Sequence, residues 1–198
     1  MAQSEGRHAE RREQSIERLQ QAAVELLGSK NYANIRIEDI AGRAGMAKGS
    51  MYMYFKGKDD LYLQVFDRFF NEMFGEEFEQ FGTADDPRQA LRGLIEFAVN
   101  QTSPSDEIMF IYRAVLDPSL SKLIKHHTDQ YIARYFGLVE GLFKRLGSGE
   151  VKERGYLLAV LLDGLWFYRI MEMEPQELVT SKKKCDALKE TIFKLFEL

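Results

Sequence analysis

Apolar residues recur along most of this chain at positions i, i+3, i+4 and i+7, the spacing of amphipathic helices, and not in the alternation of strands. Breaks rich in glycine, proline and serine occur at 82–87, 102–106 and 147–149. The sequence shows no strand pattern and no internal repeat, so we predict an all-α chain of about nine helices. The predicted helices span residues 13–27, 37–44, 47–54, 58–81, 87–100, 108–116, 117–146, 156–168 and 188–196.

The segment from Ile37 to Leu61 has the pattern of a helix-turn-helix. Its first helix is apolar on one face, and Gly45 follows where that pattern stops. Glycine ends helices well because it takes a left-handed conformation without steric cost. Met46 is expected to be buried at the corner. The second helix has only about two turns, which bury little by themselves. We therefore expect its outer face to bind a partner, and the simplest candidate is the major groove of DNA.

This segment reads IEDIAGRAGMAKGSMYMYFKGKDDL and resembles the DNA-binding head of the TetR family of bacterial and archaeal transcriptional regulators. With three positions further upstream, the resemblance covers about the first third of the chain. It implies a three-helix head, a helical body that binds a small effector, and a homodimer on palindromic DNA, and we expect a repressor. The matching residues are Ala22, Leu26, Tyr32, Ile40, Ala41, Ala44, Gly45, Lys48, Gly49, Tyr52, Tyr54, Phe55, Lys58 and Leu61.

Three positions depart from the family pattern. Arg36 stands where a capping threonine is usual, and Ala47 stands where the recognition helix usually begins with serine. The loss of such a cap costs about 1 kcal/mol at a typical site. Asn31 replaces a usual glycine, a change that asparagine tolerates in left-handed backbone. The missing caps and the apolar Met53 leave an alternative open, which is a helical interaction module of the same fold that has lost sequence-specific DNA binding.

The candidate DNA-binding residues lie on and around the second helix of the motif, which spans about residues 36–55. Gly49 would allow close approach to the DNA backbone, Arg36 and Lys58 are expected to hold phosphates, and Met53 is the solvent-facing recognition position. Phosphate contacts would supply most of the affinity, and specificity would rest partly on DNA shape. The predicted DNA-binding residues are Arg36, Lys48, Gly49, Ser50, Tyr52, Met53, Tyr54 and Lys58.

The net charge of −4 is unevenly distributed along the chain. Residues 1–58 hold 10 basic and 7 acidic residues, whereas the remainder holds 17 basic and 24 acidic ones. This asymmetry is typical of a small basic head on an acidic body. Residues 1–12 lack apolar periodicity and are predicted to be a flexible basic arm, which either contacts DNA or is a solvated end. We then expect a helix-turn-helix domain at 13–71 and an effector-binding and dimerisation domain at 72–198.

The stretch 156–168 is apolar except for Asp163 and Gly164. A helix that is hydrophobic all round must be buried on every side, and this one is too short to span a bilayer. One face is therefore expected to pack inward and the other against a second subunit, together with the last helix, in a four-helix bundle. The predicted dimer-interface residues are Tyr156, Ala159, Val160, Asp163, Phe167, Leu188, Ile192 and Leu195.

The resemblance also implies an effector cavity among the body helices. Such pockets are lined by aromatic side chains with a few polar groups, although most of these residues are core at helical spacing. Arg113 and Arg169 interrupt apolar stretches and either bind an anionic headgroup or pair with Asp163 or Glu172. We expect a hydrophobic or amphipathic effector, such as a fatty acyl derivative or a hydrophobic drug. The predicted pocket residues are Phe97, Phe110, Arg113, Tyr131, Tyr135, Trp166 and Arg169.

Other chemistry is not indicated by the sequence. Adjacent His126 and His127 point about 100° apart on a helix and make a poor chelate. The single Cys185 has no resolving partner and fits a reducing compartment. No catalytic set or phosphate loop is present, so we expect neither enzyme activity nor a metal or cofactor. The absence of a membrane-span pattern and of a signal-peptide pattern predicts a soluble, cytoplasmic protein.

Overall fold

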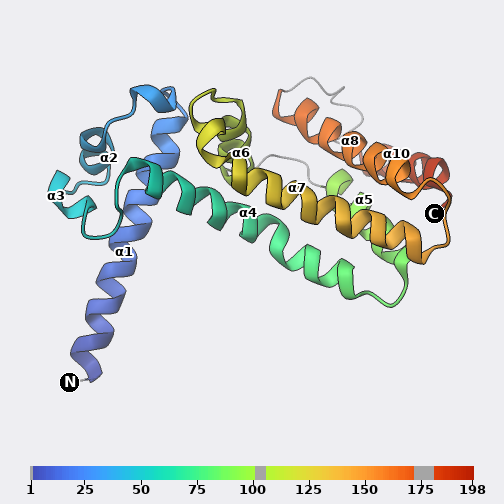
Figure 1. Ribbon diagram of the computed structural model, residues 1–198, viewed down its shortest axis with the longest axis horizontal. Coiled ribbons are helices and arrows are strands. Elements are labelled where there is room, and N and C mark those ends of the chain that lie inside the picture. The colour runs from blue at the N-terminus through green and yellow to red at the C-terminus, as the bar shows by residue number, and fades with distance from the viewer. Residues whose placement is uncertain (1, 101–105, 172–180) are drawn as a thin grey trace. The chain divides into compact units, whose positions relative to one another are not determined.

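The structure is a computed structural model of the 198-residue chain, and it describes residues 2–100, 106–171 and 181–198 (Figure 1). Every regular element in these residues is a helix, which confirms the all-α prediction. The elements are α1 (Ala2–Leu27), the 3-10 helix η1 (Tyr32–Asn34), α2 (Ile37–Arg43), α3 (Lys48–Met51), α4 (Lys58–Thr83), α5 (Pro87–Asn100), α6 (Asp106–Leu116), α7 (Leu120–Arg145), α8 (Val151–Ile170) and α10 (Lys182–Phe196).

The chain forms two compact units. Unit 1 comprises Met1–Phe70 and Phe110–His127, and unit 2 comprises Asn71–Met109 and Thr128–Leu198. The division after residue 70 lies close to the predicted domain boundary, but the end of α6 and the start of α7 belong to unit 1. The functions assigned to the two predicted domains remain predictions.

Unit 1 is built around Tyr62 of α4, whose side chain is fully buried. Its hydroxyl donates a hydrogen bond of 2.8 Å to the carbonyl oxygen of Ala23 in α1. The ring meets Tyr32 edge-on at 5.1 Å between centroids and stacks on Phe110 of α6 at 6.3 Å. Burial and the nearby charge of Asp117 raise the pKa of the Tyr62 phenol. These contacts fix α1, η1 and α6 around the first half of α4.

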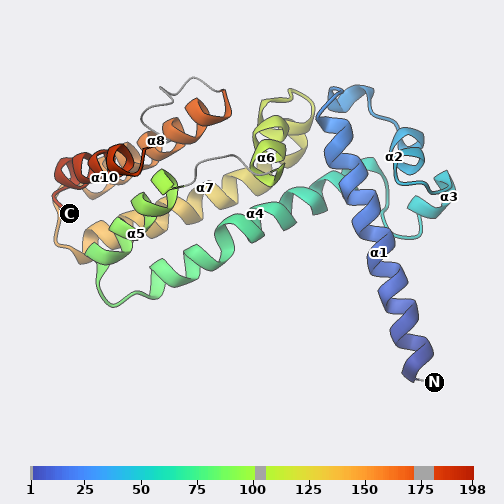
Figure 2. The same cartoon turned by 180° about the vertical axis from the view of Figure 1, so that it is seen from behind.

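The first helix begins at Ala2, so the predictions of a flexible arm at 1–12 and of a helix start at residue 13 were wrong. Residues 6–14 are all exposed, and Figure 2 shows this end of α1 extending beyond the other helices of its unit. The sequence here is rich in alanine, glutamate, glutamine and arginine, which are strong helix formers without any apolar face. Apolar periodicity is therefore a poor guide to where an exposed helix begins.

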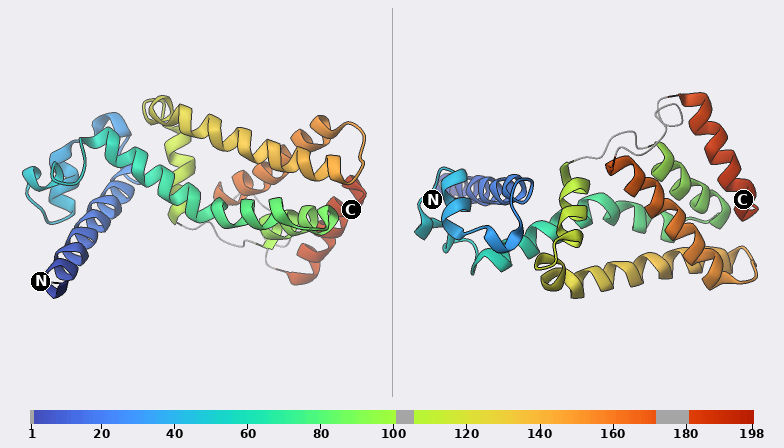
Figure 3. Two further views of the ribbon diagram at one scale, coloured as in Figure 1. Left: turned by 60° about the horizontal axis from the view of Figure 1, so that its bottom comes forward. Right: turned by 90° about the horizontal axis from the view of Figure 1, so that it is seen from above.

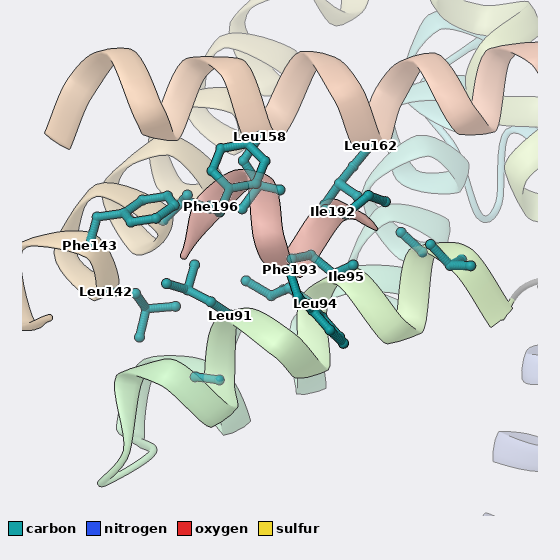
Figure 4. Close-up of a cluster of buried hydrophobic side chains, with 14 of the residues drawn as sticks. Leu91, Leu94, Ile95, Leu142, Phe143, Leu158, Leu162, Ile192, Phe193 and Phe196 are labelled. Atoms are coloured by element: carbon teal, nitrogen blue, oxygen red, sulfur yellow. The ribbon is translucent and has the colours of Figure 1, made fainter. Parts of the chain in front are cut away.

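Unit 2 contains an apolar core formed by α5, α7, α8 and α10 (Figure 4). Leu91 and Ile95 of α5, Phe143 of α7, Leu158 of α8 and Phe193 of α10 are almost completely buried there. The right-hand view of Figure 3 shows α8 turning back along α7. Gly155 makes this approach close, because a Cβ at that position would lie 3.3 Å from Glu140.

Helix α8 is longer than predicted and is not buried on every side within one chain. Leu158 and Leu162 face the core, whereas Tyr156, Val160 and Tyr168 are about half exposed. The inference that one face packs inward is therefore correct, and its opposite face is open in the single chain. In the part of the chain that the structure describes, no helix is long and apolar enough to cross a membrane.

Candidate nucleic-acid interface

The corner between α2 and α3 is a Schellman turn centred on Gly45. Gly45 has a φ of +66°, as the sequence predicted. The N–H of Met46 donates to the carbonyl of Ala41 at 2.8 Å, and that of Gly45 to Gly42 at 3.1 Å. Met46 itself is only half-buried, so its predicted role as the buried corner residue was wrong. The methionine that fills the core here is Met51, which is fully buried.

Helix α3 is shorter than expected, since regular helix ends at Met51. Tyr54 and Phe55 still donate to the Met51 carbonyl at 3.0 Å, so the chain continues as a tight turn. Ala47 caps α3 without a side-chain hydrogen bond, and the helix itself contains glycine and serine, which are weak helix formers. The buried side chains of Met51 and Phe55 therefore hold α3 in place, because its own helical propensity is low.

The outer side of this turn presents most of the predicted DNA-binding residues to solvent. Tyr52 is 52% exposed and Met53 is 72% exposed. Arg36, Lys48 and Gly49 are also exposed, while Ser50, Tyr54 and Lys58 are half-buried. No atom lies within 4 Å of where a Cβ on Gly49 would be, so packing within the chain does not require glycine there. A large exposed aromatic and a large exposed methionine side by side are typical of a contact surface.

The start of α2 shows how the chain manages without the usual cap. Arg36 makes no side-chain capping bond. Instead, the carboxylate of Asp39 accepts a 3.0 Å hydrogen bond from the backbone N–H of Arg36. This bond and the Lys30 ammonium, 3.3 Å from Asp39, hold the pKa of the Asp39 carboxyl below its usual value. The Arg36 side chain thus remains exposed, where it is accessible to a phosphate.

Lys58 has a different role from the one predicted. Its ammonium donates to the backbone carbonyls of Tyr32 and Ile35, at 2.9 and 3.0 Å, and lies 4.0 Å from the Tyr32 ring centroid. These bonds fasten the start of α4 to η1. A lysine that satisfies two carbonyls and a ring is a structural tie, so the structure does not support Lys58 as a phosphate ligand.

Replacing Lys58 by methionine is therefore expected to destabilise the protein without changing its electrostatic contact with DNA. Methionine keeps most of the aliphatic part of the lysine side chain, but two charge-assisted hydrogen bonds are lost. Urea titrations should therefore show the free energy of unfolding falling by about 1–3 kcal/mol. Lys56→Met, at an exposed position, is the control and should stay within about 0.5 kcal/mol. A stable Lys58→Met variant whose DNA binding depends less on salt would restore the phosphate assignment.

Two residues that the sequence did not single out stabilise the motif, one from α1 and one from within α2. The guanidinium of Arg18 in α1 donates to the carbonyl of Ala44 at the end of α2. Glu38 in the first turn of α2 pairs with Lys48 at the start of α3, with 2.5 Å between Oε1 and Nζ. Neither role could be found from sequence, because each joins residues on different helices. Arg18, Arg43 and Glu25 also line a shallow opening of about 330 Å³ between α1 and the turn.

The predicted dimer-interface residues are divided between the core and the surface. Ala159 and Ile192 are buried within the chain, which contradicts their assignment to an intersubunit contact, and Leu188 packs against the core of unit 2. Of the predicted interface residues, those that remain exposed are Tyr156, Val160, Asp163, Phe167 and Leu195.

Helix α7 adds to this exposed face, which the sequence did not predict. Ile132 is half exposed, and Phe136 stacks on Tyr156 with 6.1 Å between centroids. We call the exposed residues Ile132, Tyr156, Val160 and Phe167, with Phe136, the α7–α8 face. Asp163 lies on the same face, because positions 160, 163 and 167 follow the spacing of one side of a helix. Although the residue is exposed as a whole, desolvation by its surroundings raises the pKa of the Asp163 carboxyl.

The predicted pocket residues are not all brought together. Phe110 is buried in unit 1 between Tyr62 and Phe69. Arg113 is exposed and lies against the end of α1, where a Cβ on Gly28 would be 2.9 Å from its Nη1. Both residues therefore stabilise unit 1, and the pocket assignment is not supported for them. The other five belong to unit 2, namely Phe97, Tyr131, Tyr135, Trp166 and Arg169.

Arg169 of α8 is a buried cation, and its guanidinium lies at the C-terminal end of helix α5. Its guanidinium donates to the carbonyl oxygens of Ala98 and Val99, at 2.6 and 3.0 Å, and lies 5.9 Å from the Trp166 ring. Cations stabilise helix C-termini, where the last carbonyls lack intrahelical partners. The alternative partner Glu172 lies outside the described residues. Elsewhere in unit 2, burial and the charge of Asp163 raise the pKa of Tyr135.

Metal chemistry finds no support in the described residues, which contain no group of three or more potential ligands. His127 instead pairs with Asp67, with 2.6 Å between Nδ1 and Oδ1. This pair joins α7 to α4 within unit 1. Cys185 is buried in the core of unit 2.

Comparisons with known proteins agree with this architecture. Residues 19–65 match the family model of bacterial regulatory proteins, tetR family. A fatty acid metabolism regulator protein of Bacillus subtilis is 26% identical over 136 residues, covering 67% of this chain and 68% of the relative. The transcriptional activator FasR of Mycolicibacterium smegmatis is 27% identical over 142 residues, which cover 70% of this chain and 63%, less than two thirds, of FasR. The solved structure of FadR from Bacillus subtilis in complex with stearoyl-CoA superimposes with a TM-score of 0.63 at 18% identity, over 90% of this chain and 95% of that one.

Proposed function

Because the chain belongs to the TetR family of transcriptional regulators, we propose that it binds a palindromic operator as a homodimer and represses transcription until a small amphipathic effector releases it. The observation that carries the proposal is the exposed pair Tyr52 and Met53, held outward by the buried Met51 and Phe55. This pair directly follows the short helix that would enter the major groove, so its side chains would lie beside the DNA. The two heads would lie about 34 Å apart, or a multiple of one DNA turn.

We propose a long-chain acyl-CoA as the effector. Support comes from the relative named as a regulator of fatty acid metabolism and from the FadR structure that holds stearoyl-CoA. Unit 2 of this chain has half-buried aromatic residues on α5 and α7, Phe97, Tyr131 and Tyr135, which suit an acyl chain. A ligand that binds both states equally shifts nothing, so moving the balance from 99:1 to 1:99 needs about 5.5 kcal/mol of preference.

The test is fluorescence anisotropy on a duplex that the wild-type protein enriches from a randomised library. With four phosphate contacts per subunit, the logarithm of the binding constant should fall with log salt at a slope of about −7. The double variant Tyr52→Ala with Met53→Ala should bind the selected duplex at least about tenfold more weakly, since apolar and base-edge contacts are worth about 1–3 kcal/mol each. Its binding to scrambled DNA should change little. Val115→Ala, an exposed apolar residue of α6, is the matched control.

Stearoyl-CoA added to the same complex should lower the affinity for the selected duplex, whereas free coenzyme A should not. Failure to bind any duplex at low salt, with or without the acyl-CoA, would favour the interaction module that lacks DNA binding. Normal DNA binding without a response to acyl-CoA would reject the effector class alone.

A further inference from the structure

The one lysine of α3 is neutralised within the chain. Lys48 Nζ lies 2.5 Å from Oε1 of Glu38, and more than half of each side chain is exposed. The hydrogen bond between them is the main cause that lowers the pKa of the Glu38 carboxyl and raises that of the Lys48 ammonium. Both groups are therefore charged at neutral pH, and together they present no net charge at the start of the helix that would enter the groove.

Two other basic side chains around the motif also lie beside carboxylates, and a third is bound to backbone carbonyls. Arg43 lies 3.2 Å from Glu25, Lys30 lies 3.3 Å from Asp39, and Lys58 donates to backbone carbonyls. A lysine or arginine that is already paired with a carboxylate contributes less binding free energy when it contacts a DNA phosphate, because the new contact must break the existing ion pair. Non-specific DNA affinity comes almost entirely from such phosphate contacts.

We propose that Glu38 determines specificity by withholding Lys48 from indiscriminate phosphate contacts; this rests on the DNA-binding function proposed above. On random DNA, only the electrostatic effect acts, so the carboxylate lowers affinity. On the operator, Glu38 has a second effect, because it fixes the Lys48 side chain and links α2 to a four-residue helix that lacks a side-chain cap. This fixed geometry favours base-edge contacts and offsets the lost phosphate contact.

The experiment compares Glu38→Gln with wild type on two duplexes, the one selected by the wild-type protein and a scrambled one of equal composition. Glu38→Gln should bind the scrambled duplex about fivefold more tightly, with a salt slope steeper by about 1–2 for the dimer. Affinity for the selected duplex should change less than about twofold, so the ratio of selected to scrambled affinity falls about 2.5-fold or more. Both constants are measured by anisotropy at several salt concentrations.

Two controls separate the ion pair from a general change in charge. Glu25→Gln also removes one carboxylate and releases an arginine of the same head, and it should change the ratio little. In a Lys48→Gln background, Glu38→Gln should lose its effect on scrambled DNA, because the lysine it restrains is gone. The proposal is overturned if Glu38→Gln weakens both duplexes, strengthens both equally, or acts unchanged without Lys48. Wild-type protein that binds neither duplex would instead reject the DNA-binding function itself.

Discussion

Replacing Val160 by glutamate is expected to convert the proposed homodimer into monomers. Val160 is 48% exposed in the single chain and lies between Tyr156 and Phe167 on the α7–α8 face. An exposed position tolerates the carboxylate, so the fold should be unaffected. A second copy packed on this face would have to desolvate the charge without a partner, which costs several kcal/mol. The dimer dissociation constant should therefore rise about a thousandfold or more.

Sedimentation velocity over a series of protein concentrations measures this change directly. Affinity for a duplex with two half-sites should fall with it, because two separate heads no longer bind as one unit. Leu116→Glu is the matched control, since Leu116 is an apolar residue of unit 1 that is 65% exposed and lies outside the α7–α8 face. A Val160→Glu protein that still sediments as a dimer would place the interface elsewhere. Wild-type chain that is monomeric at micromolar concentration would contradict the regulatory proposal as a whole.

Features that depend on one residue and its immediate neighbours could be predicted from the sequence. Gly45 is an example, because the left-handed conformation that closes the α2–α3 turn is strained for any residue with a side chain. The breaks before Pro87 and at Gly147 also coincide with helix ends, since proline and glycine impose their conformations locally. The all-α fold follows from the sum of such local signals.

Features that depend on which face of a helix is covered could not be predicted. Ala159 and Val160 are neighbours in an apolar stretch, yet the packing of α8 against α5 and α7 buries the first and exposes the second. Lys58 is predicted from the sequence to hold a phosphate, but η1 leaves two carbonyls within its reach. Arg169 likewise meets the end of α5, which is about 70 residues earlier in the chain.

A comparison of Asp117→Asn with Asp86→Asn should measure how strongly the corner between α6 and α7 is tied to the head. Asp117 Oδ1 accepts from the N–H groups of Ser119 and Leu120, at 2.9 and 3.0 Å, and so caps α7. Its Oδ2 accepts from the N–H of Tyr32 in η1 at 2.9 Å. Asp86 is also a capping aspartate, accepting from Arg88 at 2.8 Å at the start of α5.

Asparagine caps helices about as well as aspartate, so Asp86→Asn should change the free energy of unfolding by less than about 0.5 kcal/mol. In Asp117→Asn the amide oxygen can keep the cap, but the NH₂ group then faces the Tyr32 N–H, and two donors oppose each other. The unpaired buried donor and the lost charge should lower the free energy of unfolding by about 1–3 kcal/mol. Urea titrations measure the free energy of unfolding of both variants. The protein concentrations are matched because dimerisation also contributes to stability.

The pH dependence gives a second, independent measurement. Partial burial alone would raise the pKa of Asp117, but the hydrogen bonds from Leu120, Tyr32 and Ser119 outweigh it and hold the pKa below its usual value. The carboxylate therefore contributes its full stabilisation above about pH 4, the pKa in the unfolded chain, and loses it as pH falls through the lower folded-state pKa. The stability gap between wild type and Asp117→Asn should narrow as the pH falls below about 4. A gap that stayed constant down to pH 3 would show that the carboxylate charge has no part in joining Tyr32 to the corner.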